Sequence, residues 1–341
     1  MCGLRAAGLG EGAGGITRRD LLLGGAAAVL LAGCGGSGNV RKGETSGSRT
    51  IDHEYGKTTI DGSPERIVSV GYTDHDPILA LGMRPVGIRR WFGNPPRGVW
   101  PWARDVLGDA RPRLLPENSI NYEQVAALKP DLIVGISSGM NRKDYDVLSE
   151  FAPTLPQSGR WPQYGVPWQE QTLVIGRALG REQKARELVA NLEERFEQTR
   201  REHPEFEGAT VSVIGTGSGA FYLYSTVDRS VAFFTALGFR LPAPAARIAP
   251  KDRYYVQISE ERLGVADADV LICFCSSPAD ERRLRSSAVF RRLGAVKDGR
   301  TIYLSEDDDL TRAALSFDTV LSHPYLLEHL VPKLSWLLEK A

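Results

Sequence analysis

The sequence predicts an α/β protein of two doubly wound lobes, with mostly parallel sheets, joined by one long interlobe helix. Three observations predict it. Short apolar strand patterns alternate with helical patterns along most of the 341 residues, as in parallel α/β sheets. Residues 181–201 carry apolar side chains at three- and four-residue steps, which predicts a helix of about 30 Å. The chain on either side of this helix repeats one series of elements.

The repeat has four elements in the same order on each side. They are a strand (67–70 and 211–214), an Ala-Leu-Gly turn (80–82 and 236–238), a glutamate (Glu123 and Glu261), and a strand after seven further residues (131–134 and 269–272). Each element alone is common in α/β proteins. Their shared order favours two homologous lobes.

The domain boundaries follow from this repeat. We expect a first lobe over residues 51–167, bridging helices over 168–203 and a second lobe over 204–341. The long helix should end before Pro204, because proline cannot continue a helix. The length suits two domains, and 42% hydrophobic with 25% charged residues is typical of globular proteins.

The charge balance argues against nucleic-acid binding. The formal net charge is zero. The first 33 residues carry Arg5, Arg18 and Arg19 against Glu11 and Asp20, a net of +1, so the remainder carries about −1. A protein that binds nucleic acid through its phosphates is expected to be strongly basic.

Residues 1–34 match a twin-arginine lipoprotein signal. Arg18 and Arg19 precede the apolar run 21–31, which is too short to span a bilayer and suits a signal peptide. Leu31-Ala32-Gly33-Cys34 matches a bacterial lipobox, so we expect Cys34 to be acylated, as with palmitate, and to become the mature N-terminus. A cleaved signal with an incidental cysteine is the alternative. Residues 35–50 should form a flexible tether that holds the folded part outside the cytoplasmic membrane.

In the first lobe, ligand-binding residues are expected where the parallel strands end. The expected elements are a hairpin (52–61), strands (66–71, 85–89 and 131–136), helices (74–81, 121–128 capped by Asn121, and 143–150) and an aromatic-rich loop (90–102). The loop holds four large aromatic side chains, which argues against disorder.

The second lobe is expected to follow the same plan. Its expected elements are strands (208–215, 221–224, 254–258, 269–274 and 301–304), a helix (229–237), a helix capped by Ser259, and closing helices over 317–338 interrupted by Pro324 and Pro332. Gly215–Ala220 fits a dinucleotide fingerprint, but the strand pattern after it favours a hairpin turn. Cys273 and Cys275 should be buried free thiols on one face of a strand.

Several segments resemble actinobacterial iron–siderophore substrate-binding lipoproteins, which belong to the single-helix-bridged class of periplasmic binding proteins. The segments are 66–72, 81–89, 100–102, 122–134 and 138–153, and the resemblance extends from about 51 to 333. The class includes binders of ferrichrome, enterobactin, haem and vitamin B12. The resemblance implies a monomer without enzyme activity that captures a ferric siderophore between its lobes. It would deliver this ligand to the permease dimer of an ABC importer.

The resemblance also assigns a role to one glutamate in each lobe. Glu123 and Glu261 match the acidic residues that dock each lobe onto arginines of the permease dimer. The alternative is that each glutamate only stabilises the positive N-terminal end of its helix.

A ferric siderophore is bulky and often anionic, so its cleft needs aromatic walls and donors. Arginine suits carboxylate and catecholate oxygens, and tyrosine and tryptophan supply rigid area with a polar tip. Trp168 and Trp336 are instead expected in the core. The candidate ligand-binding residues are Tyr72, Arg89, Arg90, Trp91, Trp100, Arg142, Trp161, Tyr222, Tyr224, Arg229, Arg253 and Tyr254.

Other functions stay open at this point. A resident metal is not expected, because the five histidines do not gather at the strand ends. Haem or a corrinoid is an alternative ligand, with Tyr72, Tyr222 or Tyr224 as a possible haem-iron ligand. A siderophore-processing hydrolase would need a nucleophile, a base and an orienting acid, and the sequence places no such set in one cleft. An envelope scaffold without small-molecule traffic is a further alternative.

Overall fold

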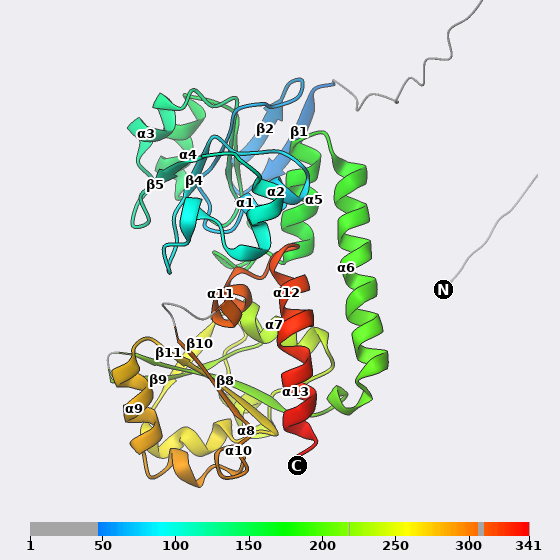
Figure 1. Ribbon diagram of the computed structural model, residues 1–341. Helices are drawn as coiled ribbons and strands as arrows, with labels where there is room; N and C mark the ends of the chain where they lie inside the picture. The colour runs from blue at the N-terminus through cyan, green and yellow to red at the C-terminus, as the bar shows by residue number, and fades with distance from the viewer. Residues whose placement is uncertain (1–46, 218, 306–309, 341) are drawn as a thin grey trace, which may run out of the picture. The chain divides into compact units, whose positions relative to one another are not determined.

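The computed structural model describes residues 47–217, 219–305 and 310–340 (Figure 1). The twin-arginine motif, Cys34 and residues 35–46 of the predicted tether lie outside the described residues. The end of that tether was predicted wrongly, because Arg49 and Thr50 belong to strand β1 (Arg49–His53), which pairs with β2 (Gly56–Ile60). Within the described residues, the two-lobe α/β arrangement with a long connecting helix is confirmed.

The first lobe is built on a five-stranded parallel sheet with the order β5-β4-β3-β6-β7. Its strands are β3 (Ile67–Ser69), β4 (Gly87–Arg89), β5 (Arg113–Leu115), β6 (Leu132–Gly135) and β7 (Thr154–Pro156). The hairpin β1 (Arg49–His53) and β2 (Gly56–Ile60) precedes it. The helices are α1 (His75–Ala80), α2 (Arg104–Leu107), α3 (Tyr122–Ala127) and α4 (Arg142–Ser149). Strands β3 and β6 are fully buried, as expected of a sheet covered on both faces.

The second lobe contains a mixed five-stranded sheet with the order β10-β9-β8-β11-β12. Its strands are β8 (Val211–Gly217), β9 (Ala220–Tyr224), β10 (Tyr255–Ile258), β11 (Val270–Cys275) and β12 (Thr301–Ser305). Strands β8, β11 and β12 pair in parallel, whereas β9 pairs antiparallel with both of its neighbours, β8 and β10. The helices are α7 (Arg229–Ala236), α8 (Ala243–Ile248), α9 (Pro278–Ser286), α10 (Gly294–Lys297), α11 (Leu310–Phe317), α12 (Ser322–His329) and α13 (Val331–Leu338).

Two helices connect the lobes. Helix α5 (Trp168–Ala178) packs against α6 (Glu182–Glu202), and α6 ends just before Pro204 as predicted. The apolar stripe of α6 belongs to both cores: Ala185 packs in the first-lobe core, whereas Leu192 and Phe196 pack in that of the second lobe. Figure 1 shows α6 running along both lobes, next to α5 in the first and α12 in the second. A helix anchored in both cores restricts large rotations of one lobe against the other.

Three further details of the prediction were wrong. Pro324 and Pro332 lie in the first turns of α12 and α13 and interrupt neither helix, since a proline there removes no intrahelical hydrogen bond. Glu261 lies in a 3₁₀ helix (Glu260–Ala266), and the Ser259 side chain makes no capping bond to its backbone. Trp336 is 52% exposed, with its ring under the Lys340 ammonium group, whereas Trp168 is buried as expected.

Two other predictions for the second lobe are confirmed. Strands β8 and β9 pair antiparallel, with Gly217 opposite Ala220, so the glycine-rich segment joins two strands of a hairpin and precedes no helix. Cys273 and Cys275 are buried free thiols. In the ranges that the structure describes, no cluster of three metal-ligating histidine, cysteine or acidic side chains was found. The described helices also include none with the length and apolar character that crossing a membrane requires.

Candidate ligand-binding site between the lobes

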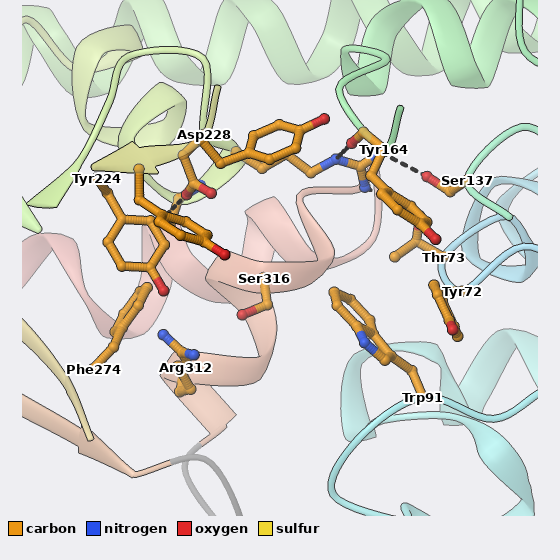
Figure 2. A pocket seen from close by; sticks show the side chains of 14 residues that line it. Tyr72, Thr73, Trp91, Ser137, Tyr164, Tyr224, Asp228, Phe274, Arg312 and Ser316 are labelled. Atoms are coloured by element: carbon orange, nitrogen blue, oxygen red, sulfur yellow. Dashed lines mark hydrogen bonds between the residues drawn. The ribbon is translucent and has the colours of Figure 1, made fainter. Parts of the chain in front are cut away.

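The candidate site is a cavity of about 440 Å³ between the two sheets, a volume in the range of small-molecule sites (Figure 2). Both lobes line it, and half of the lining residues are aromatic. The first lobe and the segment before α5 contribute Tyr72, Thr73, Trp91, Ser137 and Tyr164. The second lobe contributes Tyr224, Asp228, Arg229, Ser230, Tyr254, Tyr255, Phe274, Arg312 and Ser316. Tyr72, Trp91 and Ser137 follow the ends of β3, β4 and β6, where a parallel sheet is expected to bind its ligand.

The first-lobe wall is a stack of aromatic rings backed by an arginine. The rings of Tyr72 and Trp91 are stacked with centroids 5.4 Å apart. Behind them, the Arg89 guanidinium lies 4.2 Å from the centre of the Tyr72 ring and donates to its hydroxyl at 2.8 Å. Packing against this cation restricts the orientation of the tyrosine ring.

Arg89 is a buried cation whose hydrogen bonds go to neutral groups of the described residues. It is 5% exposed and donates to the backbone carbonyls of Ser138, at 2.9 Å, and Glu117, at 2.9 and 3.1 Å. The described residues place no carboxylate within 4.0 Å of its guanidinium, since no ion pair involves it. Its charge therefore contributes a positive potential behind the cavity wall.

Arg229 crosses from the second lobe to the first. It is the first residue of α7, whose N-cap is Asp228. Its guanidinium donates to the hydroxyl of Ser137 at 2.6 Å, to the hydroxyl of Thr73 at 3.3 Å and to the carbonyl of Tyr164 at 2.6 Å. All of these acceptors are neutral, so the cavity carries a second positive charge without an ion pair to a described carboxylate.

The second-lobe wall repeats the combination of rings and arginine. The Arg312 guanidinium of α11 lies 3.5 Å from the centre of the Phe274 ring, which belongs to β11. Tyr224, at the end of β9, packs edge-on against Phe274 with centroids 5.5 Å apart. Figure 2 shows this group facing Trp91 and Tyr72 across the cavity. Each lobe thus presents an aromatic wall reinforced by a guanidinium.

Two acids near the cavity have raised pKa values. Burial raises the pKa of Asp228 to about 6, although its carboxylate accepts hydrogen bonds from the Ser230 backbone and side chain. Burial also raises the pKa of Asp74 to about 6, against the opposing effects of Gln171, of the Ser137 backbone and of Arg229. Both carboxyls lose their charge just below neutral pH, which leaves the arginine charges less balanced.

Three lining tyrosines are held in the protonated form. Burial raises the pKa of Tyr164, Tyr224 and Tyr254 above the ordinary phenol value. At neutral pH these side chains therefore present phenol groups and aromatic faces rather than phenolate charges.

Five of the twelve candidate residues line this cavity: Tyr72, Trp91, Tyr224, Arg229 and Tyr254. Arg89 lies behind the Tyr72 ring, and Trp100 is buried in the aromatic cluster around Phe317. The other five do not line it. Trp161 borders two separate cavities, and Tyr222 packs on Tyr255 outside the candidate cavity. Arg142 forms an ion pair with Asp146 on α4, and both Arg90 and Arg253 are exposed.

Nine lining residues are not among the twelve candidates: Thr73, Ser137, Tyr164, Asp228, Ser230, Tyr255, Phe274, Arg312 and Ser316. Four of them are direct sequence neighbours of the candidates Tyr72, Arg229 and Tyr254: Thr73, Asp228, Ser230 and Tyr255. The signal that identified the candidates therefore also identifies these positions to within one residue. Arg312 and Ser316 lie on α11, most of which precedes the predicted closing helices. Phe274 lies at the end of a predicted strand for which no ligand contact was predicted.

Glu123 and Glu261 occupy equivalent places in the two lobes. Glu123 is in the first turn of α3, which Asn121 caps by accepting from the Gln124 backbone. Glu261 is in the first turn of the 3₁₀ helix, and a hydrogen bond from the Ser259 side chain lowers the pKa of its carboxyl. Both glutamates are exposed.

Two lobes that share a long helix and enclose a cavity at the strand ends define a bilobal ligand-binding protein of the periplasmic type. The sequence model of the periplasmic binding protein family matches residues 67–307, and the chain belongs to this family.

Relatives with curated names match over most of their length. A Bacillus subtilis (strain 168) protein named "Probable siderophore-binding lipoprotein YfiY" is 29% identical over 287 residues, covering 80% of this chain and 86% of the relative. The Fe(3+)-citrate-binding protein YfmC of the same organism is 27% identical over 303 residues, covering 84% and 88%. A solved periplasmic solute binding protein from Mycobacterium smegmatis str. MC2 155 superimposes with a TM-score of 0.76 at 32% identity, covering 86% of this chain and 100% of that one.

Proposed function

We propose that the protein captures a ferric siderophore in the cavity between its lobes and delivers it to the permease of an ABC importer. The observation that carries this proposal is one aromatic cavity lined by both lobes, with Arg229 in its lining and Arg89 behind its wall. Neither cation forms an ion pair with a carboxylate of the described residues. A ligand with anionic oxygens would supply the missing negative charge.

The ligand chemistry follows from this balance. Charged hydrogen bonds from a guanidinium to a carboxylate or catecholate oxygen are stronger than bonds to neutral carbonyls and hydroxyls. The aromatic walls suit the flat or apolar surfaces of a chelate. The names of the relatives, a siderophore-binding lipoprotein and a ferric-citrate-binding protein, support a ferric chelate as the ligand class.

The same proposal covers location and partners. Acylation of Cys34 after twin-arginine export would hold the protein, as a monomer, at the outer face of the cytoplasmic membrane. The permease dimer would contact Glu123 of one lobe and Glu261 of the other. The exposure of both side chains at equivalent positions supports a partner with two-fold symmetry.

The protein is proposed to bind and not to transform its ligand. Three serines line the cavity. Ser137 accepts a hydrogen bond from Arg229, Ser230 donates one to Asp228, and Ser316 is the third. The lining residues include no histidine to serve as a base for any of the three serine hydroxyls. This arrangement supports a binding role over ester hydrolysis.

The proposal is tested by titrating the tryptophan fluorescence of the soluble form that begins at Gly35. Trp91 lines the cavity and should report occupancy. The titrants are ferric citrate, ferrichrome, ferric enterobactin, their iron-free forms and haem. Free tryptophan corrects for quenching by light absorption.

Saturable quenching by a ferric chelate, with weaker binding of its iron-free form, is the expected result. Saturation by haem alone would move the function to haem uptake, with Tyr72 or Tyr224 as the residue to test for iron ligation. An absence of saturation with every titrant would refute iron capture in this cavity.

A further inference from the structure

A short strap at the edge of the cavity, residues 163–166, is bonded to both lobes. The Gln163 side chain donates to the Gly139 carbonyl of the first lobe at 2.9 Å. From the second lobe, the Tyr254 hydroxyl donates to the Gln163 carbonyl, and Arg229 donates to the Tyr164 carbonyl at 2.6 Å. The strap therefore links the two walls of the cavity.

Tyr164 has an unfavourable backbone conformation in this strap. Its φ of 67° places it in the left-handed region, which non-glycine residues rarely occupy. Among the described non-glycine residues with positive φ, it is the one that lines the cavity. Backbone strain of this kind persists where the surrounding contacts impose it, and it concentrates at functional sites.

The strained backbone places the Tyr164 ring beside the first-lobe wall. The ring stacks on Tyr72 with centroids 6.0 Å apart, which extends the row of rings that begins at Trp91 (Figure 2). Space for the ring depends on Gly139, because a Cβ at that position would overlap the Tyr164 hydroxyl. Tyr164 nevertheless remains 37% exposed, so the free energy gained by burying its ring only partly offsets the backbone strain.

We propose that Tyr164 is a specificity-determining residue of the ligand cavity and that Arg229 positions it through the backbone of the strap. This assignment rests on the proposed function. The Tyr164 ring contributes the third face of the aromatic wall, against which a flat or apolar surface of the ferric chelate packs. The bond from Arg229 to the Tyr164 carbonyl couples that ring to the second lobe.

The test uses Tyr164→Gly, because glycine is relaxed at positive φ and the variant should fold. We expect a melting temperature equal to or above that of the wild type, together with at least a tenfold increase in Kd. The titrant is whichever of ferric citrate, ferrichrome and ferric enterobactin saturates the wild type. Tyr164→Phe, which keeps the ring, should retain most of the affinity.

Lys129→Gly is the matched control. Lys129 is an exposed non-glycine residue with a φ of 48°, away from the cavity after α3. This variant relieves a similar backbone strain, so its melting temperature should also hold or rise while its Kd stays unchanged. The Arg229 role is tested by Arg229→Lys in both backgrounds. It should weaken binding less in the Tyr164→Gly variant than in the wild type, because the two residues act as one unit.

Each outcome decides a separate point. If the wild type binds a ferric chelate and Tyr164→Gly binds it with the same Kd, the specificity role is overturned while the proposed function stays in place. Equal losses from Arg229→Lys in both backgrounds would overturn the positioning role. If no ferric chelate saturates the wild type, the proposed function fails, and the assignment of Tyr164 fails with it.

Discussion

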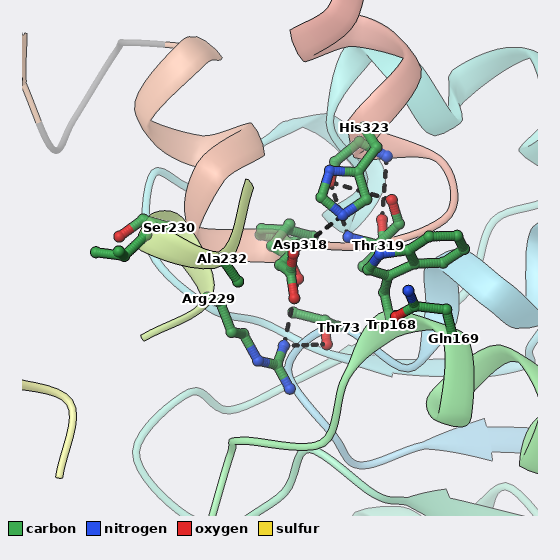
Figure 3. A network of polar contacts seen from close by, with 12 residues as sticks. Thr73, Trp168, Gln169, Arg229, Ser230, Ala232, Asp318, Thr319 and His323 are labelled. Atoms are coloured by element: carbon green, nitrogen blue, oxygen red, sulfur yellow. Dashed lines mark hydrogen bonds and ion pairs between the residues drawn. The ribbon is translucent and has the colours of Figure 1, made fainter. Parts of the chain in front are cut away.

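The Thr319 hydroxyl donates to the Asp76 carboxylate at 2.6 Å and so joins the segment after α11 to α1 of the first lobe. The same carboxylate oxygen accepts from the Trp102 indole at 2.9 Å, while its other oxygen lies 3.6 Å from His75. Figure 3 shows Thr319 next to the Asp318–His323 pair, whose nearest atoms are 3.0 Å apart. A polar contact between the lobes is thus completely buried.

Replacing Asp76 by Asn should change how stability depends on pH. Burial raises the folded-state pKa of Asp76 to about 6, above its ordinary value of 3.8. Between these values the folded state holds a proton that the unfolded state has lost, so this group lowers stability as the pH rises from 4 to 6. Asn does not titrate, so between pH 4 and pH 7 the free energy of unfolding of the variant should rise by on the order of 2 kcal/mol relative to that of the wild type. Urea unfolding across this range measures it.

His75 provides the opposing control. Burial lowers its pKa to about 4, so the folded state binds fewer protons than the unfolded state between pH 4 and 6.5, and stability falls on acidification. The stability of His75→Gln relative to the wild type should therefore increase toward acidic pH, whereas that of Asp76→Asn should increase toward neutral pH. A constant difference between Asp76→Asn and the wild type at every pH would contradict the burial of an ionisable carboxyl.

Truncating Phe317 to Ala should destabilise the protein by about 3–5 kcal/mol, because a large buried ring leaves a cavity. Phe317 of α11 is 2% exposed and contacts Trp91 and Trp102 of the first lobe at centroid distances of 5.3 and 5.5 Å. Loss of support for Trp91 should also weaken chelate binding. Trp336→Ala, at an exposed ring, should cost less than about 1 kcal/mol and leave binding intact. Thermal and urea unfolding compare the two variants.

Replacing Arg89 by Met should weaken the binding of an anionic chelate more than that of a neutral one. The substitution removes the buried charge behind Tyr72 but keeps much of the side-chain volume. We expect about a tenfold or greater loss for ferric citrate, which is one charged interaction of about 1.4 kcal/mol, and a smaller loss for ferrichrome. Arg253→Met, at an exposed site outside the cavity, is the control. Equal losses for both chelates would exclude charge selection by Arg89.

Reversing the charge of Glu123 and Glu261 together to Arg should abolish iron uptake in cells while leaving chelate affinity unchanged. Both glutamates are exposed and lie outside the cavity. The matched control reverses Glu150 and Glu202, which are also exposed. Normal iron uptake with Glu123 and Glu261 both changed to Arg would contradict docking and leave these glutamates only the role of stabilising the N-terminal ends of their helices.

Ligand binding should produce only a small closure. Helix α6 is anchored in both cores, and contacts such as Arg229 to Ser137 already join the lobes. Small-angle X-ray scattering should therefore show a change in the radius of gyration of no more than a few ångströms on saturation. A larger decrease would mean that α5 and α6 bend or detach.

The fold was predictable from the sequence because its central elements carry strong patterns. The apolar stripe of α6 and the continuous apolar runs of β6 and β11 specify buried elements on their own. The edge strands β5 and β7 were missed because neither carries a continuous apolar run: β5 has one buried residue, Leu115, and β7 ends in Pro156.

The site was less predictable, because its residues meet only after the lobes pack together. Tyr72, Trp91 and Arg229 follow strand ends or begin a helix, so topology identified them. Phe274 and Arg312 form a wall through a contact between β11 and α11 that no local pattern encodes. The predicted burial of Trp336 was wrong because its helix is largely apolar, yet this position of the helix faces solvent.

The burial of Cys273 and Cys275 makes the folded domain suitable for site-directed labelling. Burial raises the pKa of Cys275 to about 11 and that of Cys273 well above the ordinary thiol value, so thiol reagents should react with neither. A form that begins at Gly35 also lacks Cys34. Cysteines introduced at the exposed positions Lys143 on α4 and Lys297 on α10 would then be the reactive pair, and spin labels on them would give one distance from lobe to lobe.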